Sequence, residues 1–388
     1  MALPLKYSFR NVFVRWRSSL STIGGVMVVV GVWVWMQAMA AGLEKAAGNT
    51  GDPRNLLITR RGSDSESGSQ ITRDDLAAMQ YAEEIERDAA GHPLITADAL
   101  IVIYLPRAGA GSGGANVVFR GTGPNGTALR PQAKLVEGRW FVPGNREVTI
   151  SRRLAVRFAS MGVGGTIKIG ARELKVVGHF DAGGSAFDSE AWLDADEARS
   201  VFNRSNYSSL LLRPTDEAAG ARLKARIEAD KRFVVRVGKE VAYYAEQTKT
   251  ATPIRYAGSF LAVILSIGAV LAGMNTMYAS IGARTREIGT LRVLGYRRRS
   301  IIGAILIEGA SLSLLGGALG AGLALLGNGY RAGTFNFQTF SESVFEISIP
   351  PVLIVEALVF AILVGLLGAL LPALRAARMP VIAALKSL

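Results

Sequence analysis

Cysteine is absent from this chain of 388 residues, and histidine occurs only twice, as His92 and His179. The lack of cysteine excludes disulfide bridges, catalytic thiols and cysteine-based zinc sites. The two histidines are far apart in the sequence, which is more typical of ordinary surface or turn residues than of metal ligands. The chain also has no Gly-x-Ser-x-Gly elbow, no His-Glu-x-x-His motif and no Gly-x-x-x-x-Gly-Lys-Ser/Thr loop. We therefore expect a protein that is not an enzyme and that holds no metal and no cofactor itself.

Charge is scarce as well, since charged residues make up 19% of the chain and hydrophobic residues 49%. Four long stretches are nearly uncharged: 18–43 and 256–283 have no charged residue, 300–330 has only Glu308 and 347–374 has only Glu356. Because about 20 mostly apolar helical residues span the hydrocarbon core, each stretch is long enough to cross a bilayer. The sequence predicts an integral membrane protein with four transmembrane helices.

Basic residues gather beside the uncharged stretches. They are Lys6, Arg10, Arg15 and Arg17 before the first, Arg284, Arg286, Arg292, Arg297, Arg298 and Arg299 between the second and third, and Arg375, Arg378 and Lys386 after the fourth. The connection 331–346 instead has a net charge of −1. Because basic loops stay in the cytoplasm, we expect both termini and the 284–299 loop to be cytoplasmic, in a multi-pass protein of a bacterial inner membrane.

The long segment between the first two stretches has a different composition. Residues 44–255 contain 30 basic and 26 acidic residues, the mixed surface of a folded domain, which the same rule places outside the cytoplasm. Most of the net charge of +13 of the whole chain therefore comes from residues that flank the spans. A nucleic-acid-binding face would instead gather its basic residues on a soluble fold, so we expect no nucleic-acid partner.

The first apolar stretch has a second interpretation. Arg15, Arg17, the apolar run 26–35 and the triplet Ala38-Met39-Ala40 also fit a cleavable signal peptide. The uncharged stretch is longer than a usual signal-peptide core, and three later spans keep the protein in the membrane. An uncleaved first span is favoured.

Local patterns in 44–255 indicate both strands and helices. Strand-like runs bounded by turn residues are expected at 55–59, 93–106, 116–120, 147–150, 166–169, 173–177 and 232–237. Helices are expected at 152–159, 217–229 and 240–250, and from Thr72, which forms a capping box with Asp75, toward Ala90. The domain is predicted to be mixed α/β with two lobes.

Small residues recur every four positions in the spans, which permits close helix packing. Gly316 and Gly320 share one face of the third span, Gly317 lies on the neighbouring face, and Gly365 begins a similar series in the fourth. Glu308 is a polar residue inside the third span, where an ionisable group is costly. It indicates either an interhelical hydrogen bond or proton-coupled transport, and the small number of spans speaks against the latter.

The 284–299 loop contains a short amphipathic pattern. Ile288, Leu291 and Leu294 recur every three residues between basic flanks, and Gly295 follows as a helix C-cap. A helix this short is marginal alone and needs a surface to lie on. That surface is either the membrane or a groove on a cytoplasmic protein.

These residues carry a resemblance to a known family. The run Arg284-Thr285-Arg286-Glu287-Ile288-Gly289-Thr290-Leu291-Arg292-Val293-Leu294-Gly295, with Asn275-x-Met277 before it and Ile307-Glu308 after it, resembles the MacB/FtsX-type ABC-transporter permeases. Further similar segments are 10–24, Glu137-Gly138-Arg139-Trp140-Phe141, 148–151, 175–178 and 372–380. The resemblance covers nearly the whole chain.

The resemblance implies a four-span permease with Porter-like and Sabre-like lobes in its large domain. The expected boundaries are 1–19 for a cytoplasmic amphipathic segment, 20–42 for the first span, 43–253 for the periplasmic core domain with an inserted lobe at about 117–200, 254–281 for the second span, 282–299 for the coupling-helix loop, 300–327 for the third span, 328–349 for a periplasmic loop, 350–374 for the fourth span and 375–388 for a cytoplasmic tail. The chain would transmit the motion of a separate ATPase across the membrane.

The resemblance also implies partners and a coupling site. Two copies of a cytoplasmic ATPase subunit would bind ATP and Mg²⁺, and a second permease copy or a paralogue would complete a dimer. The coupling helix would present Arg284, Arg286, Glu287, Ile288, Leu291, Arg292, Leu294 and Gly295. MacB has a fused N-terminal ATPase that is not found in this sequence, which favours members with a separate ATPase.

Two functions follow from these patterns. The first is export or extraction of a periplasmic or membrane substrate, with a periplasmic adaptor and an outer-membrane component as possible further partners. The second is a membrane-anchored receptor or regulatory scaffold that moves no cargo. The sequence does not identify the substrate.

Overall fold

The structure is a computed structural model that describes residues 16–109, 113–247, 251–336 and 341–380. It divides into two compact units. The helical unit comprises 1–41, 252–330 and 347–388, and the α/β unit comprises 42–251 and 331–346. The amphipathic segment expected at 1–19 and the end of the C-terminal tail lie largely outside the described residues.

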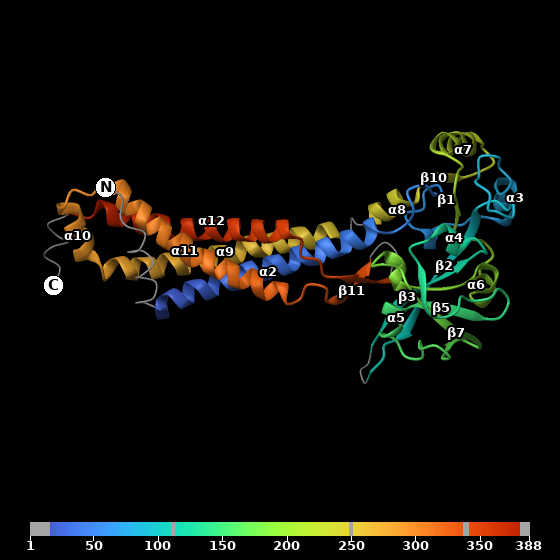
Figure 1. The fold of residues 1–388 in the computed structure, drawn as a ribbon, viewed down its shortest axis with the longest axis horizontal. Helices are drawn as coiled ribbons and strands as arrows, with labels where there is room; N and C mark the ends of the chain where they lie inside the picture. The colour runs from blue at the N-terminus through green and yellow to red at the C-terminus, as the bar shows by residue number, and fades with distance from the viewer. Residues whose placement is uncertain (1–15, 110–112, 248–250, 337–340, 381–388) are drawn as a thin grey trace. The chain divides into compact units, whose positions relative to one another are not determined.

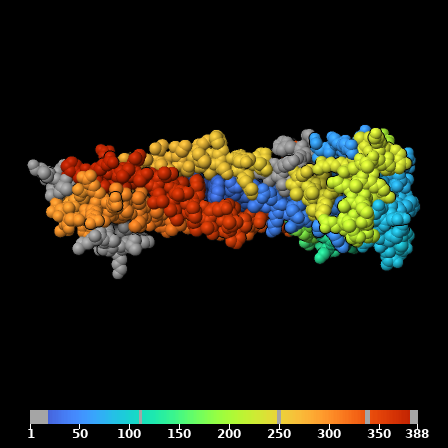
Figure 2. All heavy atoms as spheres, turned by 90° about the horizontal axis from the view of Figure 1, so that it is seen from above, coloured from blue at the N-terminus to red at the C-terminus, as the bar shows by residue number. Residues whose placement is uncertain are grey.

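Within the described residues, the helical unit consists of four long helices and one short one, which Figure 1 labels. The long helices are α2 (Trp16–Gly48), α9 (Ala251–Gly282), α11 (Arg298–Leu325) and α12 (Pro351–Arg378), and α10 (Thr285–Val293) lies between α9 and α11. Four helices of the described chain are long and apolar enough to cross a membrane, as the sequence predicts. Figure 2 shows α9 on the outside of this unit, where Tyr256, Phe260 and Val263 are exposed.

Glycines let α11 approach two neighbouring helices closely. A Cβ atom added to Gly316 would lie 2.6 Å from the backbone oxygen of Ile23 on α2, and one added to Gly320 would collide with the backbone oxygen of Met27. On the other side, Gly317 meets Ala361 of α12 and Gly365 meets Ser313. All of these contacts are within one chain, so the small residues serve intrachain packing.

We expect Gly320→Ala to lower the stability of the helical unit by about 1–3 kcal/mol, because the added methyl group has no room. Gly322, two residues further along α11, has nothing within 4 Å of an added Cβ, and Gly322→Ala is the matched control. Alanine has the better helix propensity, so this control should be neutral or slightly stabilising. Thermal unfolding in detergent compares the two variants, and equal melting temperatures would contradict the packing described.

The α/β unit contains a single ten-stranded sheet and a separate hairpin. The sheet consists of β1 (Leu56–Arg60), β2 (Ile95–Pro106), β3 (Gly114–Thr122), β4 (Lys134–Gly138), β5 (Glu147–Ser151), β6 (Thr166–Ile169), β7 (Arg172–Asp181), β8 (Glu190–Asp194), β9 (Ser209–Leu212) and β10 (Val235–Lys239). The order is β10-β1-β9-β2-β3-β8-β5-β7-β4, with β6 also paired to β7. The hairpin consists of β11 (Arg331–Asn336) and β12 (Ser341–Glu346). The mixed α/β prediction is therefore confirmed.

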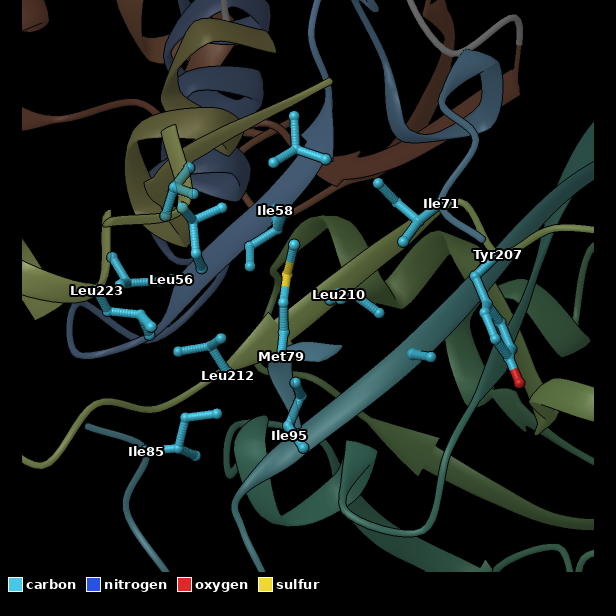
Figure 3. Close-up of a cluster of buried hydrophobic side chains, with 14 of the residues drawn as sticks. Leu56, Ile58, Ile71, Met79, Ile85, Ile95, Tyr207, Leu210, Leu212 and Leu223 are labelled. Atoms are coloured by element: carbon cyan, nitrogen blue, oxygen red, sulfur yellow. The ribbon is translucent and has the colours of Figure 1, made fainter. Parts of the chain in front are cut away.

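Two large hydrophobic cores lie against the sheet, beside smaller clusters such as the one around Trp192. The first core lies around β1, β9 and β10, under α3 (Arg73–Met79) and α7 (Glu217–Ala229), and Figure 3 shows Ile58, Leu210 and Leu212 within it. The second lies around β3, β5, β7 and β8, with α5 (Arg152–Ala155) and α6 (Ala195–Val201). Strand β2 pairs with β9 through Ile95 to Asp98 and with β3 through Ala99 to Pro106, so it joins the halves. The second core draws mainly on the stretch where the insert is predicted.

Local signals located most elements, and their lengths were less well predicted. Thr72 and Asp75 form the predicted capping box, but α3 ends at Met79 and the extension toward Ala90 was wrong. Beyond Met79 the backbone turns and pairs elsewhere, since Glu86 N–H donates to Arg213 and Ile85 forms a bridge with Pro214. Tertiary pairing overrides helix propensity there. Helix α5 is likewise shorter than the predicted 152–159.

Candidate functional site

The short helix α10 follows the end of α9 and closes with a glycine. Gly295 has φ +88°, and its N–H donates to Arg292 while Tyr296 N–H donates to Leu291. This pair of bonds is a Schellman motif, which satisfies the last carbonyl groups of the helix. The chain then enters α11 at Arg298. The predicted helix and its glycine C-cap are both present.

The two sides of α10 have different surroundings. Ile288 is only 9% exposed and packs into a cluster with Met277, Ile281, Ile301 and Ile305 of α9 and α11. Leu291 is half-buried and lines the same small cavity as Ile288. These two apolar side chains face the rest of their own unit.

The outward side presents another set of residues. Val293 and Leu294 are 61% and 67% exposed, and Arg286, Glu287 and Gly295 are exposed as well. Arg292 is half-buried and donates to the carbonyl oxygen of Ala377 at the end of α12, at 2.7 Å. The three-residue repeat did not point to Val293. Its exposure follows from which side of α10 packs, and no pattern within the loop encodes that.

Arg284 and Glu308 form a two-pronged ion pair in the helical unit. Each of two guanidinium nitrogens of Arg284 lies 3.1 Å from a carboxylate oxygen of Glu308, and both side chains are largely buried. Together with Ile288 and Ile305 they line a cavity of about 40 Å³. The pair joins the start of α10 to α11 and gives the charge of Glu308 a partner.

We expect Glu308→Gln and Arg284→Gln each to destabilise the helical unit by about 2–4 kcal/mol, because each leaves a largely buried group without its partner. The double variant should lose less than the sum of the two single variants, since neither charge is then left unpaired. Thermal unfolding of the four proteins gives the coupling free energy. Strictly additive effects would contradict an interaction between these two side chains.

A second polar cluster is buried in the α/β unit around Arg120 of β3. Arg120 donates to Glu190 of β8 at 2.7 and 2.8 Å, to Asp98 of β2 at 3.0 Å and to Glu66 at 3.2 and 3.3 Å. Glu66 begins the 3-10 helix η1 (Glu66–Gly68). All four side chains are buried. The guanidinium therefore connects three segments of the unit that are distant in sequence.

Arg130 and helix α8 (Glu240–Gln247) extend this buried cluster. Arg130 donates to Asp98 at 2.6 Å, and its Nε lies 3.4 Å from a carboxylate oxygen of Glu240. The hydroxyl of Tyr244 accepts a hydrogen bond from Arg120 at 3.0 Å. Because α8 precedes α9 in the chain, the cluster holds the segment that leads into the second span. No sequence motif signalled this cluster, since its members come from 66 to 244.

The cluster contains more carboxylates than guanidinium groups, and its pKa values reflect this. Burial by itself lowers the pKa of Arg120, but Glu190 and Glu66 outweigh burial and the pKa lies well above its usual value. Burial raises the pKa of Glu240 above its usual value, more than Arg130 lowers it. Burial thus makes the charged form of Glu240 less favourable than that of a carboxylate in water.

Asp98 has the opposite shift, and this gives a testable pH dependence. Burial raises the pKa of Asp98, but Arg130 and Arg120 outweigh it, so the pKa lies below its usual value. Ionised Asp98 therefore stabilises the fold above its unfolded pKa of about 3.9, and this stabilisation is lost as the pH falls. We expect the difference in unfolding free energy between wild type and Asp98→Asn to shrink from pH 7 to pH 3 in urea titrations. A constant difference would contradict the assignment.

Among the residues that the structure describes, no group of His, Asp and Glu is placed to hold a metal ion. The outward side of α10 and the two charged clusters are the features from which a function can be built.

Comparison with known proteins covers most of the chain. Residues 19–230 match the family model of the MacB-like periplasmic core domain, and residues 259–381 match the model described as FtsX-like permease C-terminal. The macrolide export ATP-binding/permease protein MacB of Hahella chejuensis is 32% identical over 235 residues, which are 58% of this chain and 35% of that protein. The uncharacterized ABC transporter permease YknZ of Bacillus subtilis is 27% identical over 260 residues, which are 63% of each chain.

A further relative and two solved structures are each similar to a part of the chain. The pyoverdine export ATP-binding/permease protein PvdT of Pseudomonas fluorescens is 36% identical over 130 residues, 34% of this chain and 18% of that protein. The periplasmic region of MacB from Actinobacillus actinomycetemcomitans covers 52% of this chain and 92% of its own, with 13% identity and a TM-score of 0.37. The extracellular domain of YknZ covers 47% and 99%, with 14% identity and a TM-score of 0.35. The chain spans about a third of the length of the MacB relative.

Proposed function

This chain belongs to the MacB/FtsX family of ABC-transporter permeases, and on that premise we propose that it transmits the ATP-driven motion of a separate ATPase subunit to its α/β unit. The single observation that carries the proposal is the two-sided surroundings of α10. Its inner side is packed through Ile288 and joined to α11 through Arg284 and Glu308, while Val293 and Leu294 are left exposed. A helix packed on one side that presents exposed apolar side chains on the other is suited to receive a protein and to pass its movement on.

The attachment of α10 supports transmission along more than one helix. Its ion pair reaches α11, its hydrogen bond from Arg292 reaches α12, and α9 leads into it directly. A displacement of α10 therefore acts on three long helices at once. The chain continues from each of these helices into the α/β unit, through α8 and through the β11–β12 hairpin.

We place the protein in a bacterial inner membrane, with α10 in the cytoplasm and the α/β unit in the periplasm. The support is the distribution of charge, since Arg297 precedes α11, Arg298 and Arg299 lie in its first turn, and Arg375 and Arg378 lie in the last turn of α12. ATP and Mg²⁺ would be bound by two copies of the partner ATPase. A second copy of this chain or a paralogue would complete the transporter.

The relatives' names describe macrolide and pyoverdine export. We accordingly propose that the complex exports or extracts a substrate from the periplasm or the membrane, with a periplasmic adaptor and an outer-membrane component as further partners. The substrate would be recognised by the α/β unit and those partners.

Hydrogen exchange tests the proposal in the purified complex of the chain with its ATPase in lipid nanodiscs. We expect amide exchange in α8 and in the β11–β12 hairpin to differ between the nucleotide-free and the ATP-trapped complex. An ATPase variant that cannot bind ATP is the control and should remove the difference. Exchange in the α/β unit that never responds to ATP would contradict transmission and favour a membrane-anchored scaffold.

A further inference from the structure

The connection between α11 and α12 has regular secondary structure and forms part of the α/β unit. It forms the β11–β12 hairpin, in which Arg331 pairs with Glu346 and Asn336 with Ser341. By its contacts this hairpin belongs to the α/β unit, although its sequence joins two helices of the helical unit. Connections of this length are usually exposed loops. A paired and docked hairpin therefore calls for an explanation.

Two glutamates on β12 accept ion pairs from a different part of the sequence. Glu342 pairs with Arg107, at 2.9 Å, and with Arg157. Glu346 pairs with Arg153 at 2.6 Å, and Arg153 also pairs with Asp188 at 3.1 Å. Arg107 follows β2, while Arg153 and Arg157 lie on and just after α5. The hairpin is thus held by the half of the sheet that carries the second core.

Burial makes these ion pairs specific. Glu342 is only 4% exposed, and a carboxylate removed from water to that degree is tolerated only when it is paired. Beside it, Phe345 is fully buried, and Val344 N–H donates to the hydroxyl of Ser189 at 2.7 Å. Ser189 ends the 3-10 helix η2 (Ala186–Ser189), directly before β8. The hairpin is therefore fixed by both charge and packing.

The hairpin also meets the end of α2 inside the α/β unit. A Cβ atom added to Gly42 would lie 3.0 Å from a ring carbon of Phe345 and would collide with the backbone oxygen of Glu346. Gly42 lies on α2, six residues before that helix ends at Gly48. The hairpin thus contacts the segment through which the first span enters the α/β unit.

We infer that Glu342, with Arg107 and Arg157, forms an ionic latch through which α11 and α12 act on the second half of the sheet. The inference rests on the proposed function and extends it by naming the bonds through which the hairpin acts on the sheet. The hairpin pulls on the segments that hold Arg107, Arg157 and Ser189 because it is bonded to each of them. Glu342 is a positioning residue, and it contacts no substrate or nucleotide in this role.

Three variants in the full complex test the latch. Glu342→Gln removes the charge and nearly keeps the shape, and Arg107→Gln is a milder change because Arg107 is half-exposed. Arg157→Glu combined with Glu342→Arg restores the pair in reverse. Glu173→Gln, which breaks the exposed pair with Lys168 in the same half of the sheet, is the matched control.

We expect amides of the hairpin to exchange roughly tenfold faster in Glu342→Gln, the change expected when a charge-assisted hydrogen bond is lost. The ATP-dependent change in exchange of η2 and β8 should disappear, while ATP hydrolysis, ATPase association and the response of α8 persist. Arg107→Gln should give a smaller loss of the same kind. The reversed pair should recover the response, and the Glu173→Gln control should match wild type.

Two outcomes separate the possible failures. If the wild-type complex responds to ATP and both Glu342→Gln and Arg107→Gln keep the full response of η2 and β8, the latch is overturned and the proposed function survives. If the wild-type complex shows no ATP-dependent change anywhere in the α/β unit, the proposed function fails and the latch fails with it.

Discussion

Replacing Val293 and Leu294 together by aspartate weakens binding of the ATPase subunit by about a hundredfold or more, as the loss of two central apolar anchors predicts. Both side chains are more than half exposed, so the packing of the described residues leaves these aliphatic groups at the end of α10 uncovered. Each substitution places a charged side chain at a position where the ATPase would contact an apolar group. Each also adds a negative charge near Arg297, Arg298 and Arg299. Co-purification and titration of the detergent-solubilised complex measure the loss.

The melting temperature of the chain alone separates lost binding from lost folding. Val293 and Leu294 are exposed, so the double variant should unfold within a few degrees of wild type. Val156→Asp, at an exposed valine of the α/β unit, is the matched control and should bind the ATPase normally. If the double variant bound the ATPase with wild-type affinity, the end of α10 would not be part of the contact with the ATPase.

Ile288 behaves differently in this account from what the sequence pattern suggests. The family resemblance grouped Ile288 with Leu294 among the residues expected to contact the ATPase. In the structure Ile288 is packed against Met277 and Ile301, so Ile288→Asp is expected to destabilise the helical unit and to reduce ATPase binding only indirectly. Replacement by aspartate is thus expected to cause a folding defect at Ile288 and a binding defect at Leu294.

Loss of Arg120 is expected to be the most damaging single change in the α/β unit. Arg120→Met leaves Glu66, Glu190 and Asp98 buried with only Arg130 nearby, and breaking a buried ion pair typically costs about 3–5 kcal/mol. Since a folded domain has only about 5–15 kcal/mol of net stability, the unit would be close to unfolding at growth temperature. Urea unfolding and protease resistance of the full chain measure the effect.

A further variant and a control test whether the several donors of the Arg120 guanidinium matter in addition to its charge. Arg120→Lys keeps the charge, but a single ammonium group cannot serve Glu190, Glu66 and Asp98 together, so most of the loss should remain. Arg222→Met removes an exposed arginine of α7 and is the matched control, with an effect within about 0.5 kcal/mol. Stability of Arg120→Lys equal to wild type would show that the network needs only a positive charge.

Short-range signals in the sequence predicted the elements well where local chemistry decides them. Helix α7 and strand β6 have the predicted bounds, and the capping box of Thr72 is present, because caps and alternation act within a few residues. The four spans are equally local, since each is set by a continuous run of apolar residues. The family resemblance added the Porter-like and Sabre-like lobes, the partner ATPase and the expected role of the 284–299 loop.

The features that the sequence did not reveal depend on residues that meet only in the fold. Arg120 is 54 residues from Glu66, and Glu342 is 185 residues from Arg157, so no window of sequence contains either pair. The inward side of α10 depends on α9 and α11 for the same reason. Glu308 was singled out because a charge in an apolar run is conspicuous, yet its partner Arg284 was grouped with the residues that face the ATPase.

We expect α10 and the α/β unit to lie on opposite sides of the membrane. Single introduced cysteines test this directly because the chain has no cysteine of its own. Tyr81 is 68% exposed on the α/β unit and Thr290 is exposed on α10, so Tyr81→Cys and Thr290→Cys are suitable sites. A membrane-impermeant maleimide applied to spheroplasts should label the cysteine at position 81 at once, and the cysteine at position 290 only after the membrane is lysed. Labelling of both cysteines in intact spheroplasts, or of position 290 alone, would contradict the account.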